Sequence, residues 1–287
     1  MSGGPDSVAL ARSLALLRHP LTLAYVDHKT RPETALEARF VEGLARSLRA
    51  AFVVCEVAPK DGSEASLRAA RYGALDSLPE RPIATGHTSD DQAETVLMRA
   101  LRGAGPVGLA GIPARRGRYV RPLLGVTRGD VIDFLQAIGQ RWLVDPTNSS
   151  LVVLRNRVRH ELLPAIELAV PGAGRALARL ADAARSDRDA LEYFATEHLR
   201  ENGLEIGALR KAHPGLFAHV VRLSAGVAIS HERLQALRRL VQTGAGTVEI
   251  EGGVSARIER GGELPPLSEV RVLVFRSSRV ATRHSPD

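Results

Sequence analysis

The first residues of the chain have types and spacing suited to binding an anion. The run after Met1 consists of Ser2, Gly3, Gly4, Pro5, Asp6 and Ser7. Glycines adopt positive φ and let a backbone approach an anion with no Cβ in the way. The serine hydroxyls, and the N-terminal N–H groups of the helix predicted by the next apolar run, can donate to phosphate oxygens. The same turn could simply cap that helix, but this order of residues favours a phosphate cradle.

A Walker loop is a different phosphate site, and it needs a lysine close to its glycines. The chain has only three lysines, Lys29, Lys60 and Lys211, and none follows a glycine-rich loop. The run at residues 2–7 resembles instead the PP-loop of the N-type ATP pyrophosphatases. The resemblance implies that these six residues bind ATP, which such enzymes cleave to AMP and pyrophosphate while adenylating a substrate oxygen.

Residues 86–95, Gly-His-Thr-Ser-Asp-Asp-Gln-Ala-Glu-Thr, form a second group with chemical potential. Ser89 and Gln92 have the spacing of a capping box, which predicts that a helix begins at Ser89. On that helix Asp91 and Glu94 share one face, and the apolar residues form another stripe. We therefore expect both carboxylates to face away from the core.

The acidic residues of this segment have a simpler explanation. Asp90 and Asp91 could merely complement the dipole at the helix N-terminus. That explanation leaves His87 and Glu94 without a role.

Several further motifs make the likeness to one family close. This segment, the glycine loop after it and four other stretches resemble the tRNA(Ile)-lysidine synthetase family. The glycine loop is Leu101–Gly111, and the four other stretches are Val26–Glu33, Arg68–Tyr72, Asp145–Asn148 and Arg155–His160. The resemblance covers residues 2 to about 165.

The resemblance implies a ligase that joins free L-lysine to C2 of the wobble cytidine in tRNA(Ile) with a CAU anticodon. ATP adenylates the base, and Mg²⁺ offsets the phosphate charge. A lysine ammonium has a pKa of about 10.4 and must lose a proton before it attacks. The implied catalytic residues are Asp91, Glu94, His87 and Arg102, and the implied metal ligands are Asp6 and Asp91. The glycine loop after Arg102 is expected to close over the adenylate and exclude water.

For tRNA, the expected contacts are Arg31, Arg68, Arg71, Arg155, Asn156, Arg157 and Arg159. The two-residue spacing of the last three arginines fits either an extended segment that binds phosphates or a solvated helix with arginine–carboxylate pairs. The residues alone leave both open. The family resemblance favours tRNA.

Composition narrows the alternatives. The 287 residues are 44% hydrophobic with a net charge of +7, and no apolar run is long enough to cross a bilayer. There is no signal peptide pattern, and Cys55 is the single cysteine, so we expect a cytoplasmic protein. One cysteine disfavours the thiolating relatives that use cysteine pairs or iron–sulfur ligands. A PP-loop enzyme acting on a small molecule, a non-enzymatic RNA-binding protein and a homodimer all stay open.

The order of predicted elements indicates an α/β fold. Strands at 21–26, 51–57 and 82–85 alternate with helices at 34–49, 63–78 and 89–102, which predicts a parallel sheet. In the family a strand precedes the cradle, and here Met1 adjoins Ser2, so the first strand is apparently missing: either the native start lies upstream or the chain lacks this strand. We expect a catalytic domain at 1–185 and a smaller α+β domain for tRNA or substrate at 186–287, with a disordered tail from Ser277.

Overall fold

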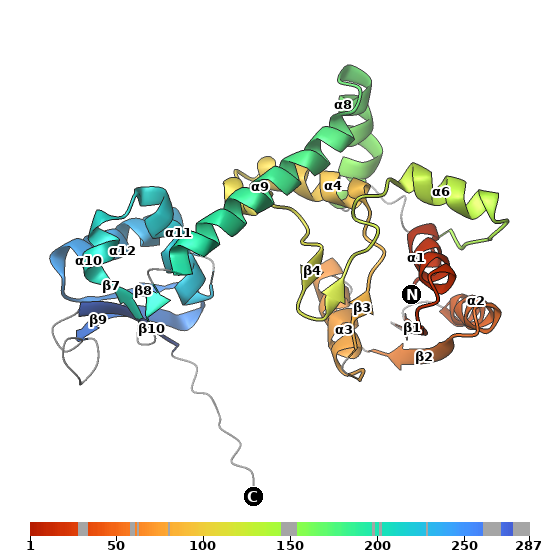
Figure 1. Ribbon diagram of the computed structural model, residues 1–287, viewed down its shortest axis with the longest axis horizontal. Helices are drawn as coiled ribbons and strands as arrows, with labels where there is room; N and C mark the ends of the chain where they lie inside the picture. The colour runs from red at the N-terminus through yellow and green to blue at the C-terminus, as the bar shows by residue number, and fades with distance from the viewer. Residues whose placement is uncertain are drawn as a thin grey trace, which may run out of the picture. The chain divides into compact units, whose positions relative to one another are not determined.

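The computed structural model forms two compact units, Met1–Arg185 and Ser186–Asp287 (Figure 1). The residues that it describes are 1–27, 34–57, 61, 63–79, 81–144, 154–196, 199–200, 203–227, 229–260 and 271–277. The motif at 145–148, most of the motif at 26–33 and the tail after Ser277 lie outside these ranges. Within the described ranges, every helix is too short or too polar to traverse a bilayer.

The first unit alternates helices and short strands. Its elements are α1 (Pro5–Leu16), β1 (Thr22–Asp27), α2 (Thr34–Ser47), β2 (Ala51–Glu56), α3 (Glu64–Asp76), β3 (Ile83–Ala84), α4 (Ser89–Ala100), α5 (Pro106–Leu109), β4 (Arg115–Arg116), β5 (Tyr119–Val120), α6 (Arg128–Ala137), α7 (Leu154–Arg157), a π-helical segment (Val158–Leu162), α8 (Leu163–Ala169) and α9 (Ala173–Thr196). Helix α9 carries the chain into the second unit.

The strands of the first unit form two small sheets. Strands β1 and β2 are parallel, and the register runs from Thr22 opposite Ala51 to Asp27 opposite Glu56. In the other sheet β3 is parallel to β5, and β4 pairs with β5 in the antiparallel sense. The amino group of Met1 donates to the carbonyl of Ala24, so the first residue lies beside β1. The expected parallel α/β arrangement is confirmed.

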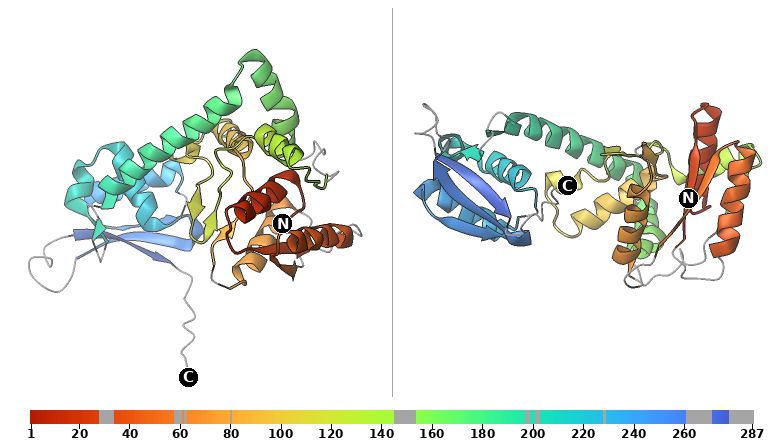
Figure 2. Two further views of the ribbon diagram at one scale, coloured as in Figure 1. Left: turned by 45° about the vertical axis from the view of Figure 1, so that its right-hand side comes forward. Right: turned by 90° about the horizontal axis from the view of Figure 1, so that it is seen from below.

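Helices bury the apolar faces of these strands. Helix α2 packs on β1 and β2, and α1 packs on α6 (Figure 2). The core between them includes Val8, Leu10, Leu23, Tyr25, Val41, Leu44, Leu123, Val131 and Leu135. Burial of this apolar surface fixes the start of α1, and with it residues 2–7.

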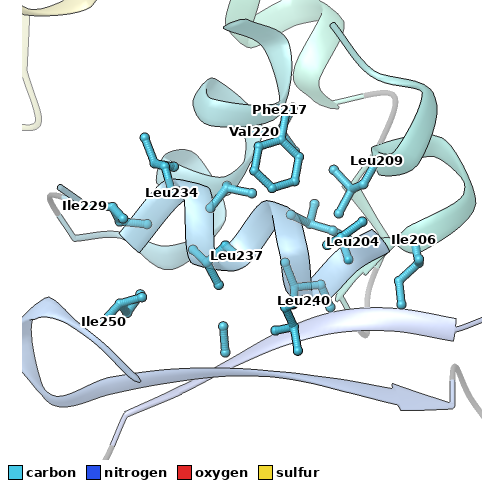
Figure 3. Packing of buried hydrophobic residues seen from close by; sticks show 14 of the residues in the cluster. Leu204, Ile206, Leu209, Phe217, Val220, Ile229, Leu234, Leu237, Leu240 and Ile250 are labelled. Atoms are coloured by element: carbon cyan, nitrogen blue, oxygen red, sulfur yellow. The ribbon is translucent and has the colours of Figure 1, made fainter. Parts of the chain in front are cut away.

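The second unit is α+β, as expected. It contains β6 (Leu199–Arg200), β7 (Gly203–Glu205), α10 (Ile206–Lys211), α11 (Pro214–Ala225), α12 (His231–Thr243), β8 (Thr247–Ile250), a 3₁₀ turn (Glu251–Gly253), β9 (Val254–Arg260) and β10 (Arg271–Ser277). The antiparallel sheet has the order β6-β7-β10-β9-β8, and α10 to α12 cover one of its faces (Figure 1). Leucine, valine and isoleucine side chains fill the space between the helices and the sheet (Figure 3).

Gly86 brings two loops of the first unit into contact. It follows β3, and a Cβ at this position would lie 2.9 Å from the carbonyl oxygen of Asp6 and 3.2 Å from the amide nitrogen of Ser7. These are backbone atoms, which cannot rotate away as a side chain can. The loop after β3 therefore reaches the start of α1 only because residue 86 is glycine.

We predict that Gly86→Ala lowers the free energy of unfolding by about 1–3 kcal/mol, because the added methyl group overpacks this contact. ATP affinity should fall in parallel, since the two loops must separate. Gly43→Ala in α2 is the matched control: its Cβ would meet nothing within 4 Å, and alanine favours a helix. Urea unfolding and ATP titration measure both effects, and equal behaviour of the two variants would contradict the prediction.

Candidate active site

The segment at residues 2–7, here called the phosphate cradle, has its N–H groups and hydroxyls gathered at one helix end. Gly3 has a φ of +72°, and Gly4 is the extended N-cap residue of α1, which begins at Pro5. The hydroxyl of Ser7 donates to the carbonyl of Gly4 at 3.0 Å, and the Ser2 and Ser7 hydroxyl oxygens are 3.5 Å apart. This arrangement fits an anion at the N-terminus of α1.

The cradle is held from outside by Leu143. Its N–H donates to the carbonyl of Gly3 at 2.9 Å. A Cβ on Gly3 would lie 2.7 Å from the side chain of Leu143 and would need a strained positive φ. Glycine is therefore required at position 3 by both conformation and space.

Asp6 has one satisfied and one unsatisfied carboxylate oxygen. Its Oδ2 accepts a hydrogen bond from Arg128 Nη1 at 2.9 Å. Its Oδ1 is buried and has no partner among the described residues. Burial raises the pKa of Asp6, and the charge of Arg128 opposes that rise. The free oxygen has the chemistry of a ligand for a hard cation.

Arg128 was not singled out in the sequence, although it joins two parts of the site. Besides pairing with Asp6, its backbone N–H donates to Asp90 Oδ2 at 2.7 Å. It follows Thr127, the N-cap of α6. An arginine in the first turn of a helix has no pattern that reveals a partner 122 residues away.

Four charged side chains form a closed network, here called the quartet: Asp91, Glu94, Arg155 and Arg159. Arg155 donates to Glu94 Oε2 and to Asp91 Oδ1, both at 2.8 Å. Arg159 donates to Glu94 Oε1 at 2.5 Å and to Asp91 Oδ1 at 3.0 Å. Each guanidinium thus bridges both carboxylates, and the formal charges cancel.

The prediction that both carboxylates face away from the core is wrong. Glu94 is 1% exposed and Asp91 is 8% exposed. The π-helical segment packs on α4 and covers the face that the helical pattern left polar. A helical wheel identifies a polar face, but it does not reveal a polar partner that buries it.

Helix α4 begins at Ser89, as predicted, but its cap differs. Thr88 is the N-cap residue, and its N–H donates to Asp91 Oδ2 at 2.9 Å. The Asp91 carboxylate therefore takes the place in the capping box that we expected the Gln92 amide to take. With Oδ1 bound by two arginines and Oδ2 by the cap, Asp91 does not fit a metal ligand in this arrangement.

The three arginines near residue 157 lie in helical structure and each has a carboxylate partner, as in the second of the two open interpretations, although only Arg157 is largely exposed to solvent. Arg155 and Arg159 pair with carboxylates. Arg157 keeps 58% of its side chain exposed and lies 3.5 Å from Glu161. Helix α7 passes here into the π-helical segment Val158–Leu162.

Gln92 holds the glycine loop that follows α4. Its Nε2 donates to the carbonyl of Ile112 at 3.1 Å, and its Oε1 accepts from the N–H of Ile112 at 2.6 Å. Arg99 donates to the carbonyls of Gly108 and Gly111 at 2.8 and 3.0 Å. Gln92 thus clamps the loop by imitating a paired peptide group, a role that the sequence did not suggest.

His87 is half-buried beside the quartet. Its Nδ1 lies 3.0 Å from the hydroxyl oxygen of Thr85. Burial, together with the charges of Arg121, Arg155 and Arg68, lowers the pKa of His87 to about 4, although the charge of Asp91 opposes this shift. The imidazole is therefore neutral at physiological pH.

Not every predicted site residue joins this cluster. Arg102 is exposed after the end of α4, about 12 Å along the helix axis from Glu94. Arg68 and Arg71 are exposed on α3, Asn156 lies on α7, and Arg31 is outside the described residues. In the described part of the chain, no three His, Cys, Asp or Glu side chains are grouped closely enough to hold a metal ion by themselves.

Comparison with known proteins agrees with this geometry. The PP-loop domain family matches residues 1–166. A tRNA(Ile)-lysidine synthase from Thermobifida fusca is 37% identical over 87% of this chain and 84% of its own length. Another from Salinispora arenicola is 38% identical over 92% of this chain and 88% of its own. The chain belongs to the tRNA(Ile)-lysidine synthase family.

Members of the tRNA(Ile)-lysidine synthase family differ in length. A tRNA(Ile)-lysidine synthase from Deinococcus deserti is 35% identical to this chain. The match includes 93% of this chain but only 53% of the length of that relative. Among solved structures, a U34-tRNA thiolase from Methanococcus maripaludis matches 64% of this chain and 70% of its own, with a TM-score of 0.51 and 15% identity. At that identity the likeness concerns the fold, which is the PP-loop α/β fold.

The quartet gives a prediction for stability. Arg159→Gln should lower the free energy of unfolding by about 3–5 kcal/mol, because it leaves a buried carboxylate short of its partner. Adding Glu94→Gln should recover part of that loss, and a double-mutant cycle measures the coupling. Arg157→Gln is the control, with a change of about 0.5 kcal/mol or less, because Arg157 is largely exposed. Additive effects of the first two substitutions would contradict the pairing.

His87 gives a prediction for pH dependence. Its pKa is about 4 in the folded chain and 6.5 without burial, so the unfolded chain takes up the proton first. The free energy of unfolding should therefore fall as pH drops from 6.5 towards 4, by about 1.4 kcal/mol per pH unit for this one proton. His87→Gln should remove that contribution, and the exposed His19→Gln controls for loss of an imidazole. Parallel stability–pH curves for the parent and His87→Gln would refute the assignment.

Proposed function

We propose that the protein ligates lysine to C2 of the wobble cytidine of tRNA(Ile) with a CAU anticodon. ATP adenylates the base, and the lysine amine then displaces AMP, so that the products are lysidine, AMP and pyrophosphate. Family membership supports this activity, because the relatives are named tRNA(Ile)-lysidine synthases. The protein is then a tRNA-modifying ligase that works in the cytoplasm, where ATP, free lysine and tRNA are present.

The observation that carries the proposal is the meeting of the phosphate cradle with the carboxylates of α4. Gly86 allows the loop that precedes α4 to lie against Asp6 and Ser7 at the start of α1. The charge of Asp91 also contributes to the raised pKa of Asp6. A nucleotide phosphate at α1 and an amine at α4 would therefore be close to each other, as a two-step ligation requires.

ATP and Mg²⁺ fit the residues around the cradle. The glycines and serines at 2–7 would hold phosphate oxygens, and Asp6 Oδ1, buried without a partner, would bind the cation. Magnesium prefers one or two carboxylates together with phosphate oxygens, so a site without three protein ligands is ordinary for it. The metal would supply neutralisation of phosphate charge during adenylation.

The carboxylates of α4 would act on the lysine amine. A lysine ε-ammonium needs a negative partner to bind and an acceptor for its proton before it attacks. Asp91 and Glu94 have that chemistry, but each already accepts from Arg155 and Arg159. An ammonium can approach only if a guanidinium gives up one of these contacts. His87, neutral and half-buried, is a weak base beside them.

For tRNA we propose that the exposed arginines of α3 and Arg157 contact RNA, with Arg31 as a further candidate. Arg155 and Arg159 are engaged with carboxylates and fit a positioning role better. The second unit, Ser186–Asp287, would add contacts to tRNA outside the anticodon. Arginine suits such contacts because its planar group pairs with phosphate and stacks on bases.

The roles of the α4 carboxylates give the prediction that tests this function. Asp91→Asn and Glu94→Gln should each lower lysine transfer at least a hundredfold, because the amine loses its partner and proton acceptor. tRNA-dependent exchange of pyrophosphate into ATP should persist, since adenylation precedes the amine. Mass spectrometry of the tRNA measures lysidine. Asp130→Asn, at an exposed cap of α6, is the control. Lysine transfer within a few-fold of the parent in both variants would contradict the role proposed for Asp91 and Glu94.

A further inference from the structure

Arg68 and Tyr72 lie one turn apart on α3 and form a stacked pair. The guanidinium carbon of Arg68 is 5.1 Å from the centroid of the Tyr72 ring. Arg68 is exposed and Tyr72 is half-buried. The outer surface of the pair is therefore a planar cation that faces solvent with an aromatic ring behind it.

The pair stands on a rigid support. Tyr119 packs edge-on against Tyr72, with the ring centroids 4.9 Å apart and the planes at 63°. Tyr119 is 8% exposed, and its hydroxyl donates to Asp76 Oδ1 at 2.5 Å. Tyr119 lies on β5 opposite Ile83 of β3, so the support is continuous with the strand that leads to His87.

Arg118 fixes the end of the helix that bears the pair. Its guanidinium donates to four carbonyl groups at and beyond the C-terminus of α3. They belong to Asp76, Leu78, Pro79 and Arg81. These bonds satisfy carbonyls that the helix leaves without partners. Arg118 is thus a structural residue that holds α3 in place.

The pair lies within electrostatic reach of the candidate active site. The positive charge of Arg68 acts on His87, as do those of Arg121 and Arg155. His87 in turn is close enough to Asp91 to respond to its charge. A ligand on Arg68 would therefore lie within electrostatic reach of His87.

Among the aromatic residues of the first unit, all of them in described stretches, Tyr72 is the one with a guanidinium over its ring. The unit contains seven aromatic residues. Tyr25 and Tyr119 are buried, and Phe40, Phe52, Phe134 and Trp142 pack against the core. Tyr72 is not part of that core cluster, and the guanidinium of Arg68 lies over its ring.

We propose that the Arg68 guanidinium, backed by the Tyr72 ring, is the surface on which the reacting cytosine stacks. This inference rests on the proposed function, which requires a wobble base withdrawn from its neighbours. Unpaired bases bound by proteins stack on aromatic rings or on arginine planes. A cytosine here would present its edge towards His87 and the α4 carboxylates, and its unstacking would be compensated by the new contact.

The test uses an anticodon stem-loop RNA with pyrrolocytosine, whose fluorescence is quenched on stacking, at the wobble position. Binding to the parent should quench it. Arg68→Gln should weaken binding about tenfold, as expected for one lost base stack, and should abolish the quenching. Arg68→Lys keeps the charge without the plane and should also lose the quenching. Tyr72→Phe keeps the ring but removes the hydroxyl that accepts from Arg68 Nη2 at 3.4 Å, so it should keep most of the quenching. Tyr72→Leu removes the ring and should reduce the quenching further.

Arg115 provides the matched control. It is an exposed arginine on β4 whose guanidinium donates to the carbonyl of Gly117. Arg115→Gln removes the same charge and should leave the quenching intact. Unchanged quenching in Arg68→Gln, or no quenching in the parent, would overturn the stacking proposal. Mass spectrometry of full-length tRNA incubated with ATP, lysine and the parent tests the function separately, because lysidine can form whether or not the base stacks on Arg68.

Discussion

Glu94 is almost completely withdrawn from water, and the need to compensate its carboxylate governs the arrangement around α4. An isolated buried carboxylate costs several kcal/mol, and only close, well-directed cations offset that cost. Arg155 and Arg159 supply them, and both also reach Asp91. The segment at 154–162 is therefore bound to α4 by charge, although more than sixty residues separate them in sequence.

The neutrality of the quartet constrains any cation that enters it. Two guanidiniums already match two carboxylates, so an incoming ammonium must replace an existing contact rather than fill an empty one. Replacing one guanidinium contact by an ammonium costs less than removing the guanidinium alone, because the carboxylates never lose all of their partners. The same arginines that stabilise the buried acids in the free protein thus set the energy that a cationic substrate must match. If the substrate amine binds here as proposed, stability and substrate binding draw on one set of hydrogen bonds.

The sequence predicted well those features that depend on neighbouring residues. The start of α1 within residues 2–7, the start of α4 at Ser89 and the strands near 22–27 and 51–56 follow from local composition and periodicity. Its failures concern partners that are distant in the chain. The burial of Glu94 depends on arginines more than sixty residues away, and the pairing of Asp6 depends on Arg128.

The cap of α4 shows a subtler limit. Thr88 and Asp91 satisfy the capping pattern as well as Ser89 and Gln92 do, with a shift of one residue. What decides between them is tertiary structure, because Gln92 is needed to pair with Ile112. A pattern that two registers satisfy locally is resolved only by contacts that the local sequence does not contain.

Because Asp91 caps α4, Gln92 is free to bind the second half of the glycine loop. Gln92 fixes Ile112, and Arg185 on α9 donates to the carbonyls of Ala110 and Ile112 at 3.4 and 3.2 Å. A Cβ on Gly111 would lie 3.1 Å from the methyl group of Ala181, so α9 packs directly on this segment. The second half of the loop is thus tied to both helices. Any movement that covers an adenylate must come from the first half, where Gly103 has a φ of +74° and open space around it.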